Sequence, residues 1–255
     1  AKNLEKVTAR NLVFGNNGIK SMFYQCSKLK EIVGIETWDT SQVSDVGSLF
    51  GYCTSLTSLN IGDWDMSNCS SFFNMFYNCK ALVDLDVSRW DTKNGINMQS
   101  VFNGCESLES IDLTNWTTPR VRFMNGMFSN CYKLQEIIGL TNITTDDVTL
   151  LNSMFSKCAY LTELDLSSFN AISTTKLDYI FQGCTRLTSI NSMKNINVDL
   201  SLEDCPNVSV ESLVSIIDNL MKVNETRILK LGAVNLAKLS ETQIKVAVDK
   251  GWSVA

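Results

Sequence analysis

One short motif recurs along almost the whole chain. The pattern Phe-x-x-Cys ends at seven cysteines that follow one another at intervals of 26 or 27 residues: Cys26, Cys53, Cys79, Cys105, Cys131, Cys158 and Cys184. An apolar residue stands three positions after each cysteine, and another follows three positions further, as in CTSLTSLNI and CAYLTELDL. Eight residues after the first of these leucines comes an aromatic residue, at Trp64, Trp90, Trp116 and Phe169. Such a fixed period is the signature of stacked structural repeats.

Each repeat combines two patterns. The segment L-x-x-L-x-L predicts a short strand with one buried face, whereas the spacing of three to four residues from Val43 to Val46 and onwards predicts a short helix. One such unit cannot bury its own apolar face, so neighbouring units must stack. We therefore expect an α/β leucine-rich repeat solenoid of about 26 residues per strand-plus-short-helix unit. It should have a parallel sheet on one face and a row of short helices on the other.

The repeat pattern divides the chain in two. Residues 1–205 are predicted to form the repeat array, in which LEKV near the N-terminus is the strand of a truncated first repeat. Residues 206–255 are predicted to form a C-terminal α/β capping unit, because a solenoid end otherwise exposes its core and its sheet edge. We expect two helices there, with Ser209 as the N-cap of the first and a capping box from Ser240 in the second, and strands at RILKLG and WSVA.

Two repeats are one residue longer than the others. CSKLKEIVGIETW and CYKLQEIIGLTNI each hold an additional residue between the first leucine and the aromatic position. We expect a β-bulge after the strand in both units.

The cysteines stand at one place in the repeat. Cys205 extends the series of seven, and only Cys69 lies outside it. Neighbouring copies stand about one strand spacing apart, roughly 4.8 Å, but parallel Cβ vectors disfavour the torsion that a disulfide needs. We therefore expect free, buried thiols. No C-x-x-C pair is present, so no zinc site is expected.

Charge and composition narrow the function. The 22 basic and 27 acidic residues give a net charge of −5 and a pI of about 4.9, which argues against nucleic acid as a partner. The absence of histidine excludes Ser-His-Asp and Cys-His catalysis, and no phosphate-binding glycine motif occurs. We expect no enzyme activity, no cofactor and no metal. No apolar stretch approaches the ~20 residues of a membrane span, so direct membrane insertion is not expected.

The open face of the predicted sheet supplies the candidate site. In L-x-x-L-x-L the third and fifth positions point away from the core, so we expect the ligand-binding residues to be Ser58, Asn60, Asp84, Asp86, Ser110, Asp112, Glu163 and Asp165. Like charges on neighbouring strands repel, and these pairs contain no base. The row is either solvated surface, a recognition surface for a cationic protein segment or a carbohydrate, or a calcium site; its interruption at Glu136 and Ile138 disfavours calcium.

Aspartates next to tryptophans, the tryptophans themselves and a series of tyrosines could also form a functional site. We expect Asp39, Asp65 and Asp91, each directly after a tryptophan, to form local turns rather than a catalytic array. The tryptophans are expected to pack in the core rather than to stack on sugars. Tyrosines that flank the cysteine series irregularly form a second candidate contact surface: Tyr24, Tyr52, Tyr77, Tyr132 and Tyr160.

The repeat as a whole resembles a known family. SMFYQCSKLKEI, NMFYNCKALVDLDVSRWDT and SMFSKCAYLTELDLSSF are similar to the BspA-type leucine-rich repeats of bacterial surface proteins, over about residues 4–205. The resemblance implies an extracellular, non-catalytic, adhesin-like module, monomeric as an isolated domain, that binds a cell-surface protein or carbohydrate. The alternative is a structural or receptor-binding component of a phage tail or a bacterial surface layer, which would place the chain on a virion or a cell surface.

Overall fold

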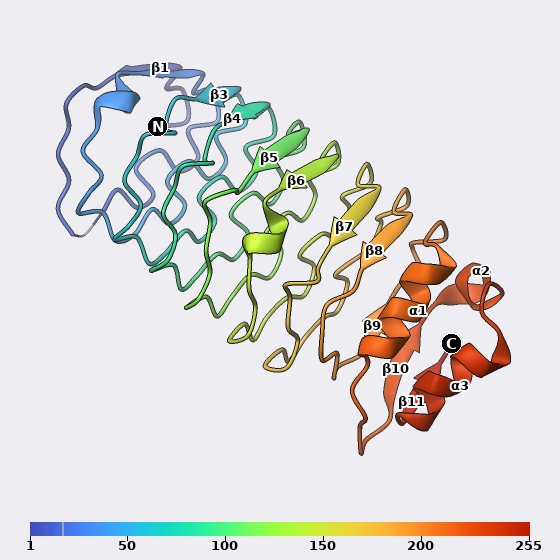
Figure 1. Ribbon diagram of the computed structural model, residues 1–255. Helices are drawn as coiled ribbons and strands as arrows, with labels where there is room; N and C mark the ends of the chain where they lie inside the picture. The colour runs from blue at the N-terminus through green and yellow to red at the C-terminus, as the bar shows by residue number, and fades with distance from the viewer. Residues whose placement is uncertain (17) are drawn as a thin grey trace.

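The repeats wind into coils that stack side by side. The computed structural model describes residues 1–16 and 18–255, and in it each coil places one short strand beside that of its neighbour (Figure 1). The strands are β1 (Lys6–Thr8), β2 (Glu31–Val33), β3 (Ser58–Leu59), β4 (Asp84–Leu85), β5 (Ser110–Asp112), β6 (Glu136–Ile138), β7 (Glu163–Asp165) and β8 (Ser189–Asn191). The predicted leucine-rich repeat solenoid is therefore confirmed.

The strands of this row pair in parallel and in repeat register. Ser110 lies opposite Glu136 and Ser58 lies opposite Asp84, so equivalent residues of successive coils face each other. Pairing is confined to β1–β2, β3–β4, β5–β6 and β7–β8. One apolar residue of each strand points inwards, as Leu85 does in β4, and the residue before it points to solvent, as Asp84 does.

The segment between the aromatic position and the cysteine is not a helix, so the prediction of one short helix per repeat is wrong. In Val46–Cys53 the even-numbered residues donate their N–H groups to carbonyls of the next coil, whereas the odd-numbered residues from Leu49 onwards donate to the carbonyl three residues back. An α-helix needs every N–H to bond four residues back. We call this segment and its equivalents the turn ladder. Successive turns also bring an apolar residue inwards every three to four positions, and this spacing suggested the helix.

Each turn ladder needs two residues with left-handed backbone. They stand five residues and one residue before the cysteine, as Ser48 and Tyr52 do before Cys53, with φ of 54° and 64°. Serine, asparagine and glycine occupy many of these positions, and glycine and asparagine adopt this conformation at low cost.

The additional residue of the two longer repeats forms a 3₁₀ turn and not the predicted β-bulge. The turns are η1 (Ile35–Thr37) and η2 (Leu140–Asn142), and each follows a glycine with positive φ, Gly34 at 88° and Gly139 at 77°. A short 3₁₀ turn absorbs one residue with its own i to i+3 hydrogen bonds, so the chain re-enters the coil path without disturbing strand register.

The core consists of ladders of identical side chains. The Phe-x-x-Cys phenylalanines stack from coil to coil with ring centroids 5.5–6.3 Å apart. The tryptophans are buried as predicted, and the Trp90 indole N–H donates to the carbonyl of Ile61 in the preceding coil at 3.0 Å. Trp38, Trp64 and Trp116 make the equivalent bond at 2.8–3.0 Å.

All nine cysteines are free and buried, as the sequence predicted. From Cys53 to Cys205 the thiols of the series donate to the carbonyl of the phenylalanine in the preceding coil, at Sγ to O distances of 3.1–3.4 Å. Burial raises the pKa of the Cys131 thiol to about 12. The thiol therefore stays neutral and acts as a small hydrogen-bond donor inside the core.

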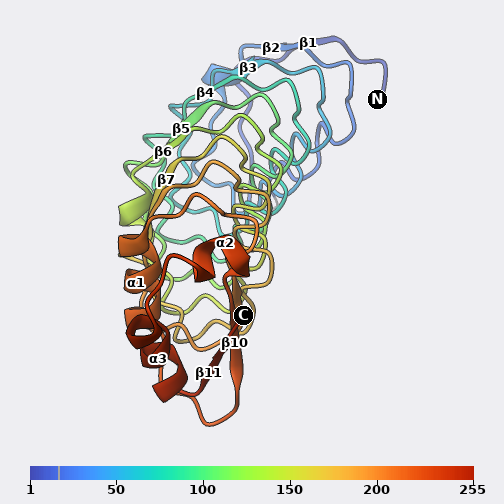
Figure 2. The same cartoon turned by 90° about the vertical axis from the view of Figure 1, so that its right-hand side faces the viewer.

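In the C-terminal part, helices lie on the side of the coils where the array has its strands, and strands lie on the opposite side. The elements of this part are β9 (Leu200–Ser201), α1 (Val210–Asn219), β10 (Arg227–Lys230), α2 (Gly232–Leu236), α3 (Glu241–Asp249) and β11 (Trp252–Val254). In Figure 2, α1 and α3 continue the outer edge of the arc along which β1–β7 lie, whereas β10 and β11 lie on the opposite edge. The predicted Ser209 N-cap and the Ser240 capping box are both confirmed.

Helix α1 occupies the place where the strand of the next coil would lie. The N–H of Ile190 in β8, which would otherwise point at a neighbouring strand, donates to the Ser212 hydroxyl at 2.9 Å. Ser209 N–H donates to the Thr188 carbonyl at 2.9 Å. We propose that residues 206–255 form the cap of the array, because α1 satisfies this edge and covers the last strand.

Truncation after Val208 tests this cap. Removing α1 leaves the N–H of Ile190 and the core side of β8 open to solvent, so we expect the shortened protein to aggregate and to lose cooperative thermal unfolding. Size-exclusion chromatography and differential scanning calorimetry measure both. A monomeric fragment that melts cooperatively at the temperature of the full chain would contradict the capping role.

Substitution Gly139→Ala tests the η2 turn. A Cβ atom at this position would lie 2.8 Å from the Leu113 carbonyl carbon and from backbone atoms of Thr114, and φ is positive. We expect the free energy of unfolding to fall by about 1–3 kcal/mol in urea denaturation. The matched control is Gly15→Ala, whose Cβ meets no atom within 4 Å and should leave stability nearly unchanged.

The buried cysteine thiols predict how the free energy of unfolding changes at alkaline pH. A thiol in the unfolded chain ionises near pH ~8.5, whereas the buried thiols of Cys53 and Cys131 have pKa values of about 12. Because the folded-state pKa is raised, their stabilisation is complete below pH ~8.5 and is lost as the pH rises towards 12. Urea denaturation at increasing pH should show this fall, and Cys131→Ala should show a shallower one. Equal slopes for the two proteins would refute the explanation.

Candidate binding surface

The strands β1–β8 form one row, which we call the strand row. The predicted site residues lie together on its solvent side. Those on β3, β4, β5 and β7 are exposed except for Asp112, which is half-buried. Register places Ser58 directly beside Asp84. The strand row therefore gathers the predicted residues on one face, although the breaks between strand pairs divide them into groups.

The fifth-position aspartates have a structural role. One carboxylate oxygen of Asp86 accepts hydrogen bonds from the hydroxyl and the N–H of Ser88, at 2.7 and 3.0 Å. These bonds lower the pKa of Asp86, and the equivalent bonds from Ser167 lower the pKa of Asp165. Asp112 accepts the N–H of Thr114 in the same way. The aspartate of the L-D-L-S pattern thus closes the turn that follows β4, β5 and β7.

The acidic row is also partly neutralised, contrary to the expectation of an uncompensated row. The Arg89 guanidinium forms ion pairs with Asp63 and with Asp86, three residues before it. In the sequence this arginine lies outside the strand positions, so the strand pattern alone did not place it on this face.

Three of the third-position carboxylates remain available to a ligand. Among the residues that the structure describes, the carboxylates of Asp84, Glu136 and Glu163 accept no hydrogen bond and form no ion pair, and all three are exposed. The turn chemistry of the fifth position therefore separates the row into structural aspartates and free carboxylates.

A hollow of about 470 Å³ opens between β6 and β7, which do not pair. Its lining comprises Gln135, Glu136, Ile137, Gly139, Leu140, Thr141, Thr162, Glu163, Leu164 and Asp165. This lining holds three carboxylates and no basic side chain. The η2 turn supplies one wall, so the longer repeat that was expected to make a bulge instead makes a recess on the binding face.

Sequence reasoning found two residues of this hollow, Glu163 and Asp165, and missed the others. The sequence feature that indicates the hollow is the interval of 27 residues from Cys131 to Cys158. It marks the coil in which the additional residue forms the η2 turn after Gly139. Glu136 occupied a third position, but the apolar Ile138 beside it made this strand look like a gap in the row.

The tyrosines form one cluster and two separate sites. Tyr24, Tyr52 and Tyr77 lie in contact on three successive turn ladders, with ring centroids 5.6 and 5.2 Å apart. Tyr132 donates to the Asn130 side chain, and Tyr160 lies under the Arg186 guanidinium, so neither joins the cluster. The predicted rim of five tyrosines is therefore not continuous.

The aspartates that follow the tryptophans close turns, as predicted. Asp39 and Asp65 each accept the N–H of the residue two positions on, at 3.0 and 2.9 Å, and Asp91 does the same with Lys93 at 3.1 Å. Within residues 1–16 and 18–255, no group of three or more histidine, cysteine or acidic side chains is arranged to hold a metal ion. No helix in this part of the chain has the length and hydropathy to cross a membrane.

Stacked coils, in-register parallel strands and ladders of buried leucine, phenylalanine and cysteine define a leucine-rich repeat protein of the BspA type. The chain belongs to the family described as Mycoplasma protein of unknown function, DUF285, whose model matches residues 17–111 and 96–208. No curated protein matches its sequence.

Two solved structures are similar over 99% of this chain. One is a leucine-rich repeat protein from Bacteroides ovatus, at 17% identity with a TM-score of 0.39, of which the chain covers 66%. The other is the internalin inlF from Listeria monocytogenes, at 12% identity with a TM-score of 0.33, of which the chain covers 80%. The chain thus spans less than two thirds of the Bacteroides protein.

Proposed function

We propose that this chain is a non-catalytic binding module of adhesin type, displayed outside the cell, that recognises a protein on a cell surface through its strand row. The supporting observation is the acidic hollow between β6 and β7, beside the free third-position carboxylates. The contact surface then comprises Glu136, Glu163 and Asp84, with Ser58 and Ser110 as hydroxyl partners.

The chemistry of the surface favours a basic partner. Three carboxylates and no cation line the hollow, and the chain as a whole carries a net charge of −5. A partner with exposed lysine or arginine side chains would be attracted over a distance of about a Debye length and held by charge-assisted hydrogen bonds. The hydroxyls of Thr141 and Thr162 add uncharged hydrogen-bonding groups at the rim.

The fixed geometry of the coils supports recognition rather than catalysis. The hollow lies on an open face, and its three carboxylates are exposed to solvent rather than enclosed in a dry pocket. A rigid arc with an exposed, polar strand row suits contact with a large surface, as binding modules of this repeat class use it.

Glu136→Lys/Glu163→Lys tests the binding face. Reversing both charges turns the attraction into repulsion, so we expect saturable binding to intact cells and immobilised matrix proteins to fall by at least about tenfold. Binding of the labelled protein to cells, matrix proteins and a glycan panel measures the effect. These positions are preferable to Asp86 and Asp112, since replacing those two would also break the turns after β4 and β5.

The matched control is Asp147→Lys/Glu225→Lys, which changes the net charge equally at exposed positions away from the hollow. Binding should persist in this control. Equal loss in both double variants would show that net charge rather than this face drives binding. Binding to glycans alone would replace the protein partner by a carbohydrate, and an absence of any binding would favour a structural component of a phage tail or surface layer.

A further inference from the structure

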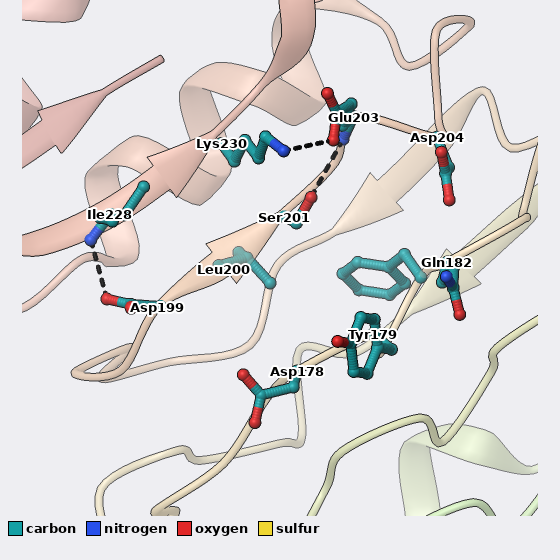
Figure 3. A pocket seen from close by; sticks show the side chains of 11 residues that line it. Asp178, Tyr179, Gln182, Asp199, Leu200, Ser201, Glu203, Asp204, Ile228 and Lys230 are labelled. Carbon is teal, nitrogen blue, oxygen red and sulfur yellow. Dashed lines mark hydrogen bonds and ion pairs between the residues drawn. The ribbon is translucent and has the colours of Figure 1, made fainter.

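A second hollow lies where the repeat array meets the C-terminal part. Its volume is about 320 Å³, and it opens among the last turn ladder, β9 and β10. Figure 3 shows Asp178 and Tyr179 at one side of it, and Leu200 and Ser201 of β9 with Ile228 and Lys230 of β10 at the other. Because β9–β11 follow the edge of the arc opposite to the strand row, this hollow is separate from the recess beside β6 (Figure 2).

Four carboxylates and one lysine line this hollow, and three of the four carboxylates already have partners. Glu203 forms an ion pair with Lys230 at 2.7 Å, Asp199 accepts the N–H of Ile228 at 2.8 Å, and Asp204 accepts the N–H of Gly183 at 3.1 Å. Asp178 is exposed, and among the described residues its carboxylate has no hydrogen bond or ion pair. A negative charge without a counter-ion thus stands at the mouth of a hollow that is already acidic.

Tyr179 beside it is an unusual residue for its place. It stands five residues before Cys184, where the backbone is left-handed and the other coils carry serine, asparagine or glycine. Tyr179 is 61% exposed, so it adds little to the core. An aromatic face, an apolar floor from Leu200 and a free carboxylate therefore meet within one small recess.

We propose that this hollow binds an arginine side chain of a partner protein. A planar guanidinium stacks on an aromatic ring and at the same time forms paired hydrogen bonds with a carboxylate, which a lysine ammonium does not. The chain itself contains the aromatic half of this arrangement, since the Arg186 guanidinium lies 4.9 Å from the centroid of the Tyr160 ring. The methylene groups of the arginine would lie over Leu200 and Ile228, and its charge would meet Asp178.

Titration with a short peptide tests the proposal directly. The probe is an acetylated, amidated pentapeptide with one arginine between glycines, added to the full chain labelled with nitrogen-15. We expect saturable amide shifts at Tyr179, Ser201 and Lys230, which weaken as salt is added. The same peptide with neutral citrulline should bind at least about tenfold more weakly, because the charge-assisted bonds are lost.

Two substitutions locate the contact. Asp178→Asn should weaken the arginine peptide about tenfold, and Tyr179→Ser, which restores the serine of other coils, about twofold to fivefold. The controls are Asp147→Asn and Tyr132→Ser, which should bind as the parent chain does, and thermal unfolding should be unchanged in all four. Equal affinity for arginine and citrulline peptides, or undiminished binding by Asp178→Asn, would overturn the proposal.

The peptide titration distinguishes the arginine site beside Tyr179 from the binding face proposed on the strand row. Shifts confined to Glu136, Thr162 and Glu163 would place the basic ligand in the other hollow, which overturns the present inference and supports the proposed binding face. Conversely, Glu136→Lys/Glu163→Lys should leave the affinity of the arginine peptide for the hollow beside Tyr179 unchanged.

Discussion

Hydrogen bonding from each coil to its neighbour is the constraint on which the structure depends. A coil of 26 residues with strands of two or three residues satisfies few of its own backbone groups, so every remaining buried N–H and carbonyl needs a partner in the adjacent coil. In the turn ladders, every second backbone N–H donates to a carbonyl of the adjacent coil. Side chains provide others: the indole of Trp90, the thiol of Cys79 and the hydroxyl of Thr92 each donate to a carbonyl one coil away.

This requirement explains the residue types of the repeat. Cysteine is small enough for the inner side of the turn and still carries a donor. The phenylalanine carbonyl, which already accepts the N–H of the cysteine in its own coil, thereby accepts a second hydrogen bond from the next coil, and alanine would remove this bond between coils. Tryptophan fills the corner and reaches a second carbonyl. The same logic governs the surface, where the aspartate of L-D-L-S serves its own turn. Some aspartates of the acidic row are thus present because they stabilise the turns of the coil, and not because they bind a ligand.

The sequence predicts the period, the buried ladders, the free thiols and the caps of α1 and α3, because these depend on residue identity at fixed spacing. It fails at Val46–Cys53, since an apolar spacing of three to four fits both a helix and a series of turns, and only the neighbouring coil decides between them. It also predicts neither hollow, although it places Glu163 and Asp165, which line the recess beside β6, on the binding face. The recess beside Gly139 arises from a one-residue insertion, and the one beside Tyr179 arises where β10 meets the last coil, so each depends on segments distant in sequence.

The free thiols have a mechanical consequence. Because no disulfide joins one coil to another, all resistance to pulling along the array comes from hydrogen bonds and packing between neighbours. Tension applied at the ends would detach coils one after another, and each would release about 26 residues, or roughly 90 Å of extended chain. The Phe-x-x-Cys period would then set the increase in contour length at each unfolding step. That increase would be one residue longer for the coils that contain η1 and η2.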